Sequence, residues 1–175
     1  MQYTYAFEQG SLDSICGVYA LVNAEKIVNG STDKQSQELF NEIITYLSKK
    51  HILRETLIEG IGHRRFSNIV EKILGERIPI RITNVKGIER LGDFWKMGVN
   101  WLSKPNRAII ISMGGREDHY TTAWAMSDRA IQVADSGGIK VIRRSACRLR
   151  GYTGTDRYVL FPSQCIFLGK ADEPE

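Results

Sequence analysis

The chain contains few of the residues that build disulfide frameworks and metal sites. It has only three cysteines, Cys16, Cys147 and Cys165, and three histidines among 175 residues. A small, odd number of cysteines does not predict a disulfide framework, and no cluster of Cys and His has the spacing of a metal site. We therefore expect no metal, no cofactor and a reducing compartment. Cys147 and Cys165 are interpreted as structural residues.

Long apolar runs are also missing, so no segment predicts a membrane span. The first five residues lack the basic and apolar pattern of a secretory signal peptide. We therefore expect a cytoplasmic protein with no membrane partner, and we leave open that it is an effector exported by a signal that the sequence does not reveal. The length of 175 residues, with 42% hydrophobic and 25% charged residues, predicts one globular domain over residues 1–175.

The formal net charge is +4, and part of the positive excess lies in the basic segment, defined here as residues 143–150 (Arg-Arg-Ser-Ala-Cys-Arg-Leu-Arg). Such a run can contact phosphates or an acidic protein. No aromatic stacking pattern and no nucleic-acid motif accompanies it, so we expect a solvated turn and no nucleic-acid partner.

The stretch from Gln9 to Ala20 predicts a loop that leads into a buried helix. Turn-forming residues precede Cys16, a glycine follows it, and an apolar run then predicts a central helix that ends near Val28. In the first turn of a helix, a sulfur atom lies near unpaired backbone N–H groups and the positive end of the helix dipole, which favour the attacking thiolate form. Cys16 is therefore our candidate nucleophile, and Asp13 is a candidate cap of this helix.

A thiol hydrolase also needs a base, a group that orients the base, and donors for the oxyanion. Gln9 lies close enough before Cys16 for the loop to bring its side-chain N–H beside the backbone N–H of Cys16. His119 begins one predicted strand and Asp135 follows the next, with a turn at residues 127–129 between the strands. Those two ends of an antiparallel hairpin are neighbours, so the Asp135 carboxylate can reach the imidazole and fix its tautomer.

Other residues fit these roles less well. His51 follows two lysines near a predicted helix end, and His63 lies in a glycine-containing loop beside two arginines. Neither is followed by a strand and a carboxylate at a useful spacing. Asp118 is a weaker candidate than Asp135 for orienting His119, because adjacent strand residues point to opposite faces. Asp135 itself lies in an Asp-Ser-Gly-Gly sequence, which taken alone predicts only a turn.

Hydrophobic periodicity predicts helices in the first half of the chain and strands in the second. Beyond the central helix, we expect helices at 33–50, 66–74 and 88–102; residues 54–65 are less regular, with a loop at 59–63. We expect strands at 2–7, 77–83, 108–113, 119–126, 130–134, 138–143, 158–161 and 164–168. The predicted fold class is α+β, with N-terminal helices packed on a C-terminal antiparallel sheet and Cys16 at the start of the central helix.

The chain resembles papain-like cysteine peptidases in the order Gln9, Cys16, His119, Asp135. Cys-Gly opens a helix, a strand follows the histidine, and Asp-Ser-Gly-Gly begins 16 positions after the histidine. The nearest branch is the bacteriocin-processing peptidases, which cleave leader peptides after a double glycine. The resemblance implies a papain-like fold in which Gln9 lines the oxyanion hole, Cys16 attacks, His119 is the base and Asp135 orients it. Ser136 stands where many members have a proline.

We therefore expect a papain-like cysteine peptidase that hydrolyses a peptide or isopeptide bond of a protein or peptide substrate. A deamidase or transglutaminase with the same triad is an alternative, because a sequence does not show whether water or an amine accepts the acyl group. A non-catalytic papain-like binding module that uses the basic segment is a second alternative. A protein partner or activator is left open.

Overall fold

A computed structural model of the chain describes residues 6–75, 77–82, 85–115, 118–149 and 157–170. The helices are α1 (Cys16–Asn29), α2 (Asp33–Lys49), α3 (Leu53–Glu59), α4 (His63–Leu74) and α5 (Leu91–Leu102), with 3-10 turns η1 (Arg144–Ala146) and η2 (Pro162–Gln164). The strands are β1 (Ile80–Ile82), β2 (Arg107–Gly115), β3 (His119–Met126), β4 (Ala130–Ala134), β5 (Val141–Arg143), β6 (Cys147–Arg148), β7 (Tyr158–Leu160) and β8 (Ile166–Gly169). No helix in these ranges is long and apolar enough to cross a membrane.

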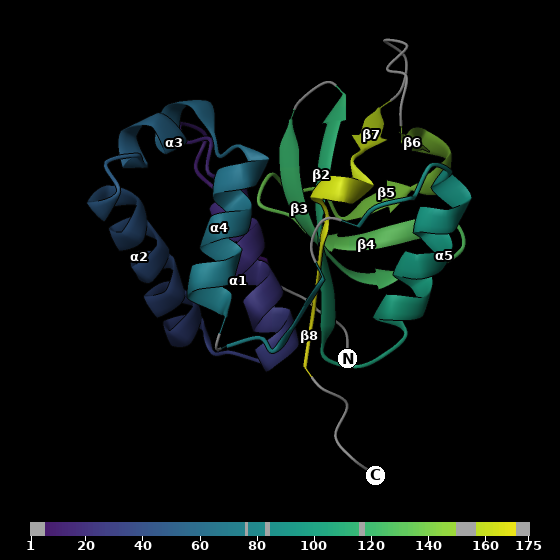
Figure 1. Cartoon of the computed structure of the whole chain (residues 1–175), viewed down its shortest axis with the longest axis horizontal. Coiled ribbons are helices and arrows are strands. Elements are labelled where there is room, and N and C mark those ends of the chain that lie inside the picture. Colours follow the sequence, from purple (N-terminus) through teal and green to yellow (C-terminus); the bar gives the residue numbers. More distant parts are fainter. Residues whose placement is uncertain (1–5, 76, 83–84, 116–117, 150–156, 171–175) are drawn as a thin grey trace.

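The strands form one mostly antiparallel sheet in the order β1-β8-β2-β3-β4-β5, to which β7 and β6 are added beside β2. Among the described strands, only the pairing of β6 with β7 is parallel. The helices α1 to α4 lie on one side of the sheet and α5 lies on the other (Figure 1). The predicted α+β class, with N-terminal helices on a C-terminal sheet, is confirmed.

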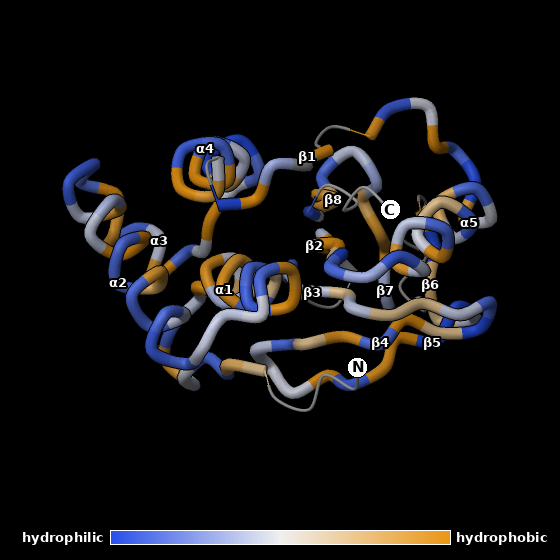
Figure 2. Tube along the Cα trace, turned by 90° about the horizontal axis from the view of Figure 1, so that it is seen from below, coloured by the Kyte–Doolittle hydropathy of each residue, from blue (hydrophilic) through white to orange (hydrophobic). Residues whose placement is uncertain are grey.

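Strand β2 separates two hydrophobic cores. Ala108 and Ile110 pack into the core formed with α1, α2 and α4, whereas Ile109 and Ile111 pack into the core formed with α5. Alternate residues of a strand face opposite sides of a sheet, so a strand covered on both sides is apolar throughout. Figure 2 shows the strands between α1 on one side and α5 on the other. The buried hydroxyl of Thr122 on β3 donates to the carbonyl of Ala20, at 2.7 Å, and ties the sheet to α1.

One edge of β2 changes partner along its length. Residues 107–110 pair with β8, and residues 113–115 pair with β7. The turn η2 joins these two partner strands, and it is held to β2 at the break by a hydrogen bond of 3.0 Å from the Phe161 N–H to the Ser112 carbonyl. A break in pairing such as this one redirects the side chains beside it.

The largest omission in the predicted elements concerns residues 54–65, which were interpreted as irregular with a loop at 59–63; residues 60–62 do lie between two helices, but no helix was predicted before them. Residues 54–65 contain most of α3, and α4 begins at His63 rather than at Phe66. Helix α3 has only 7 residues and buries only Thr56, so it carries no apolar periodicity that a sequence could reveal. Of the predicted strand at 2–7, only the last two residues are described, and they lie outside any strand.

The basic segment is more ordered than the predicted solvated turn. Residues 143–148 form the end of β5, the turn η1 and β6, and position 150 lies outside the described residues. The Arg144 guanidinium donates to the carbonyl of Asp128 at 3.4 Å and lies 5.5 Å from the ring centre of Trp95. One positive charge of this segment, that of Arg144, is therefore held against Asp128 and Trp95.

Candidate active site

Cys16 is the first residue of α1, the predicted position of the nucleophile. The Val18 and Tyr19 N–H groups both bond to the carbonyl of Ile15, and no side chain caps the helix. Among the described residues, the backbone N–H groups of Cys16 and Gly17 have no acceptor. These N–H groups are free to hold an anionic oxygen beside the sulfur atom.

The loop before Cys16 is fixed by its own hydrogen bonds and by α3. The prediction that Asp13 caps α1 is wrong, because its carboxylate instead accepts the Gly10 N–H at 2.9 Å and the Ile15 N–H at 3.3 Å within the loop. The Ser14 N–H donates to the Leu57 carbonyl at 3.0 Å, near the end of α3. Helix α3, for which no element was predicted, therefore supports the position of Cys16.

Gly17 is needed because the turn between α3 and α4 comes very close to α1. A Cβ atom at Gly17 would lie 2.7 Å from Cγ2 of Ile61 and 3.2 Å from the Phe66 ring. Both distances are shorter than a normal carbon–carbon contact. The residue after the nucleophile must therefore be small for α4 to close one side of the site.

His119 and Asp135 form a close pair on the sheet. His119 Nε2 and Asp135 Oδ1 are 2.6 Å apart, and the two side chains are only 15% and 0% exposed. The antiparallel register between β3 and β4, in which Thr122 pairs with Ala134, brings the start of β3 beside the end of β4. Since Nε2 is engaged by Asp135, the ring nitrogen that remains for Cys16 is Nδ1.

The second oxygen of Asp135 is held by the turn that follows it. Oδ2 accepts the Gly137 N–H at 2.8 Å and the Ile139 N–H at 3.2 Å. Burial raises the pKa of Asp135, but the hydrogen bond and charge of His119, together with the Ile139 N–H, outweigh burial and lower it below its usual range. Asp135 is therefore an ionised carboxylate that is fixed at both oxygens.

His119 is charged over a wide pH range. Burial lowers its pKa, but the hydrogen bonds and negative charges of Asp135 and Cys16 outweigh burial and raise this pKa to about 10. At neutral pH the ring is an imidazolium placed between a carboxylate and a sulfur atom. Such a group stabilises negative charge on sulfur and can act as an acid toward a leaving group.

Gln9 is attached to the residue after Asp135. Its backbone N–H donates to the Ser136 carbonyl at 3.1 Å, and the Ser136 hydroxyl donates to Gln9 Oε1 at 3.2 Å. With Oε1 held by the buried Ser136, the side-chain N–H groups of Gln9 remain for the cleft. The start of the same segment is tied to α1, because the Asn23 amide bonds to both the N–H and the carbonyl of Phe7, at 2.9 and 3.2 Å.

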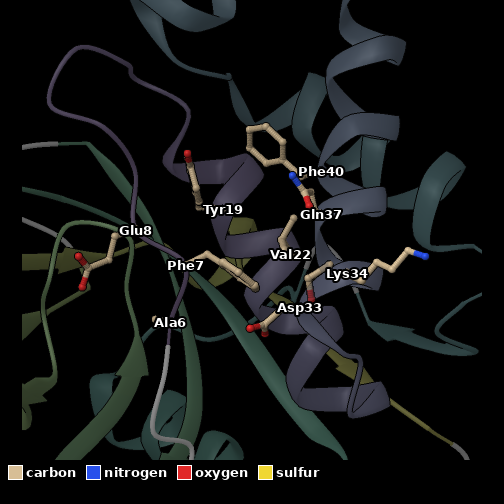
Figure 3. A pocket seen from close by; sticks show the side chains of 10 residues that line it. Ala6, Phe7, Glu8, Tyr19, Val22, Asp33, Lys34, Gln37 and Phe40 are labelled. Carbon is tan, nitrogen blue, oxygen red and sulfur yellow. The ribbon is translucent and has the colours of Figure 1, made fainter.

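Gln9, Cys16 and His119 line one cleft of about 550 Å³ between α1, the α3–α4 turn and the sheet. Asp135 lies behind His119, away from this cleft. A larger cavity of about 670 Å³ is lined by Phe7 and by side chains of α1 and α2, which Figure 3 shows from close by. The described residues that line the larger cavity include no cysteine and no histidine, so we assign the chemistry to the cleft.

The competing residues lie in different places. His63 lines the cleft from the first turn of α4, whereas His51 lies between α2 and α3 and does not line it. Asp118 is exposed at the cleft, and His119 bonds to Asp135 instead. Cys147 and Cys165 are buried as predicted, and burial raises the pKa of each thiol to about 12.

The structure brings together the four residues that the sequence singled out, namely Gln9, Cys16, His119 and Asp135. In the part of the chain that the structure describes, no three side chains of His, Cys, Asp or Glu are grouped to hold a metal ion. Comparison of the chain with protein-family models, with curated proteins and with solved structures finds no match.

Proposed function

We propose that the chain is a papain-like cysteine hydrolase that cleaves a peptide or isopeptide bond. The observation that carries the proposal is the charged His119, bonded to the buried Asp135 at 2.6 Å and interacting with Cys16 in one cleft. A nucleophile, a base and an orienting carboxylate in this order are the parts of a thiol hydrolase.

Acylation begins with attack of the Cys16 sulfur on the substrate carbonyl carbon. A C–S bond forms, and the carbonyl electron pair moves to oxygen. The Gln9 side-chain N–H and the Cys16 backbone N–H hold this oxyanion. The His119 imidazolium then gives its Nδ1 proton to the leaving nitrogen, the C–N bond breaks, and an amine departs from the thioester.

Deacylation returns the protein to its starting state. His119, now neutral, takes a proton from water, and the hydroxide attacks the thioester carbonyl through the same oxyanion site. The C–S bond breaks, and a carboxylic acid leaves with Cys16 again paired to the imidazolium. Asp135 stays ionised throughout and holds the ring orientation that both steps need.

The resemblance to processing peptidases favours a peptide with a double glycine before the scissile bond as the substrate. We place this activity in the cytoplasm, where reducing conditions keep a thiol free. All three cysteines are free in the structure.

The test is acylation of Cys16 by p-nitrophenyl acetate, followed by mass spectrometry of the modified peptides and by release of nitrophenol. The expected result is rapid acetylation at Cys16, followed by slower turnover, with both lost in Cys16→Ala and strongly slowed in His119→Ala. Cys147 and Cys165 are matched controls within the same molecule, because burial keeps their thiols protonated.

Acetylation at Cys147 or Cys165 in place of Cys16, or turnover retained in Cys16→Ala, would contradict the proposal. The acyl acceptor is tested in the same assay by adding a labelled primary amine. Transfer of the acetyl group to that amine in preference to water would move the assignment from a hydrolase to a transglutaminase with the same residues.

A further inference from the structure

A second glutamine, Gln164, lies on the wall of the cleft that the sheet provides. It ends the turn η2, at the point where the edge of β2 changes its partner from β8 to β7. Its N–H donates to the Phe161 carbonyl at 2.9 Å, and the next N–H, of Cys165, donates to the Pro162 carbonyl at 3.1 Å. These two bonds close the turn at Gln164, and the Phe161 N–H, which donates to the Ser112 carbonyl at 3.0 Å, holds the turn against β2.

The side-chain amide of Gln164 is oriented by Ser112. The Ser112 hydroxyl, on a residue that is 5% exposed, donates to Gln164 Oε1 at 3.0 Å. Ser112 pairs with Tyr120 across β2 and β3, so their side chains share one face of the sheet. Burial raises the pKa of Tyr120 to about 12, so the phenol on this face is protonated at neutral pH.

The hydrogen bond from Ser112 to Oε1 leaves the amide N–H groups of Gln164 for the cleft. Gln164 and Cys16 line the same cleft, and within the described residues the Gln164 N–H groups have no acceptor. The arrangement repeats that of Gln9, whose Oε1 is held by the Ser136 hydroxyl. Two amide donors therefore border one cleft, each oriented by a buried serine.

We propose that Gln164 is a substrate-binding residue that donates a hydrogen bond from its side-chain Nε2 to a backbone carbonyl oxygen of the peptide on the amino-terminal side of the scissile bond. The proposal rests on the proposed hydrolase function, because it assumes a peptide in this cleft. An extended peptide carries several carbonyl acceptors that must be paired once the cleft has removed water from them. The Gln9 amide donates to the oxygen of the reacting carbonyl, and the Gln164 amide donates to the oxygen of a second carbonyl.

The test compares two reagents that carry the same reactive group. Chloroacetone and N-acetyl-diglycyl chloromethyl ketone both alkylate the Cys16 sulfur with loss of chloride, but only the second carries further peptide carbonyls. The second-order rate constants are measured for the wild type, Gln164→Ala, Gln164→Glu and Ser112→Ala. Gln37→Ala, which removes an exposed glutamine of α2 outside the cleft, is the matched control.

The expected result is a fall of about three- to tenfold with the peptidyl reagent in Gln164→Ala and Gln164→Glu, a smaller fall in Ser112→Ala, and no change with chloroacetone. Gln164→Glu keeps the size and the acceptor but loses the donor. Full reactivity of that variant, an equal fall with both reagents, or a wild type that does not prefer the peptidyl reagent would overturn the role of Gln164. Failure of the proposed function looks different, because Cys16 would then react slowly with chloroacetone in the wild type as well.

Discussion

Replacement of Asp135 by asparagine removes the negative charge that faces His119 with little change in side-chain volume. An amide keeps one acceptor oxygen but loses the negative charge that faces His119. If that oxygen faces His119, the amide N–H groups oppose the N–H groups of Gly137 and Ile139, which Oδ2 now accepts at 2.8 and 3.2 Å. If the oxygen faces the turn, the amide instead donates to His119 Nε2 and selects the wrong tautomer of the ring.

The magnitude follows from the pKa of His119. A pKa of about 10, compared with the ordinary value of 6.5, corresponds to about 5 kcal/mol in favour of the imidazolium. This preference persists although burial opposes it, and Asp135 and Cys16 supply it together. Without the Asp135 charge, we expect the pKa of His119 to fall by at least about two units. Disturbing the hydrogen bonds to Asp135 should also lower the free energy of unfolding by about 2–4 kcal/mol.

The assay is a proton NMR titration of the imidazole Cε1–H of His119, assigned by its loss in His119→Ala. Asp118→Asn is the matched control, because Asp118 is an exposed carboxylate next to His119 that does not bond to it. Urea unfolding measures the stability of each variant. The reasoning is refuted if His119 titrates in Asp135→Asn within half a unit of its wild-type value, or if the wild type itself titrates near 6.5.

Three further predictions follow from neighbouring contacts. Ser136→Ala should slow acetylation of Cys16 by p-nitrophenyl acetate about two- to tenfold. Alkylation of Cys16 by iodoacetamide should be unchanged, because alkylation forms no oxyanion that Gln9 must hold. Equal effects on both rates would contradict this prediction. Gly17→Ala should cost about 1–3 kcal/mol of unfolding free energy in urea, whereas Gly62→Ala, with nothing within 4 Å of its Cβ position, should not. The free-energy difference between the wild type and His119→Ala should be largest between about pH 4 and 6.5 and should shrink toward pH 10. The raised pKa of His119 contributes stability that is lost as pH rises through about 10. The lowered pKa of Asp135 contributes stability that is lost at acid pH. A free-energy difference that does not vary with pH would exclude this linkage.

The fold class could be predicted because long periodic segments dominate this chain. Helix α2 has a single apolar face and a capping box from Thr32 to Gln35, and β2 is an uninterrupted apolar run. Helix α3 and strand β6 could not be predicted, because they have 7 and 2 residues and are formed by tertiary contacts. The change of partner along β2, from β8 to β7, could not be predicted for the same reason, since it depends on how both strands pair with β2.

The grouping of the four candidate residues could be predicted because their chemistry and order are distinctive, and the hairpin argument located His119 beside Asp135; their catalytic roles stay a prediction. The residues that orient these four side chains gave weaker signals in the sequence. Ser136 was visible only as a departure from the proline of many family members. Ser112 and Gln164 left no signal, because their contact joins β2 to η2 and neither residue type is unusual there. Hydrogen bonds between side chains distant in sequence are the part of a site that single-sequence reasoning does not reach.

In the proposed mechanism, the turn that begins at Asp135 combines two functions that hydrolysis needs at the same moment. The Asp135 carboxylate holds His119, while the carbonyl and hydroxyl of Ser136 hold the backbone and side chain of Gln9. Cys16 stands on the other side of the cleft, on α1, to which the Gln9 segment is also tied through Asn23 and Phe7. A displacement of this turn would therefore move the base and the oxyanion donor together relative to the nucleophile. The Gln9 segment links the two sides of the cleft, and it limits that displacement because it is hydrogen-bonded at both ends.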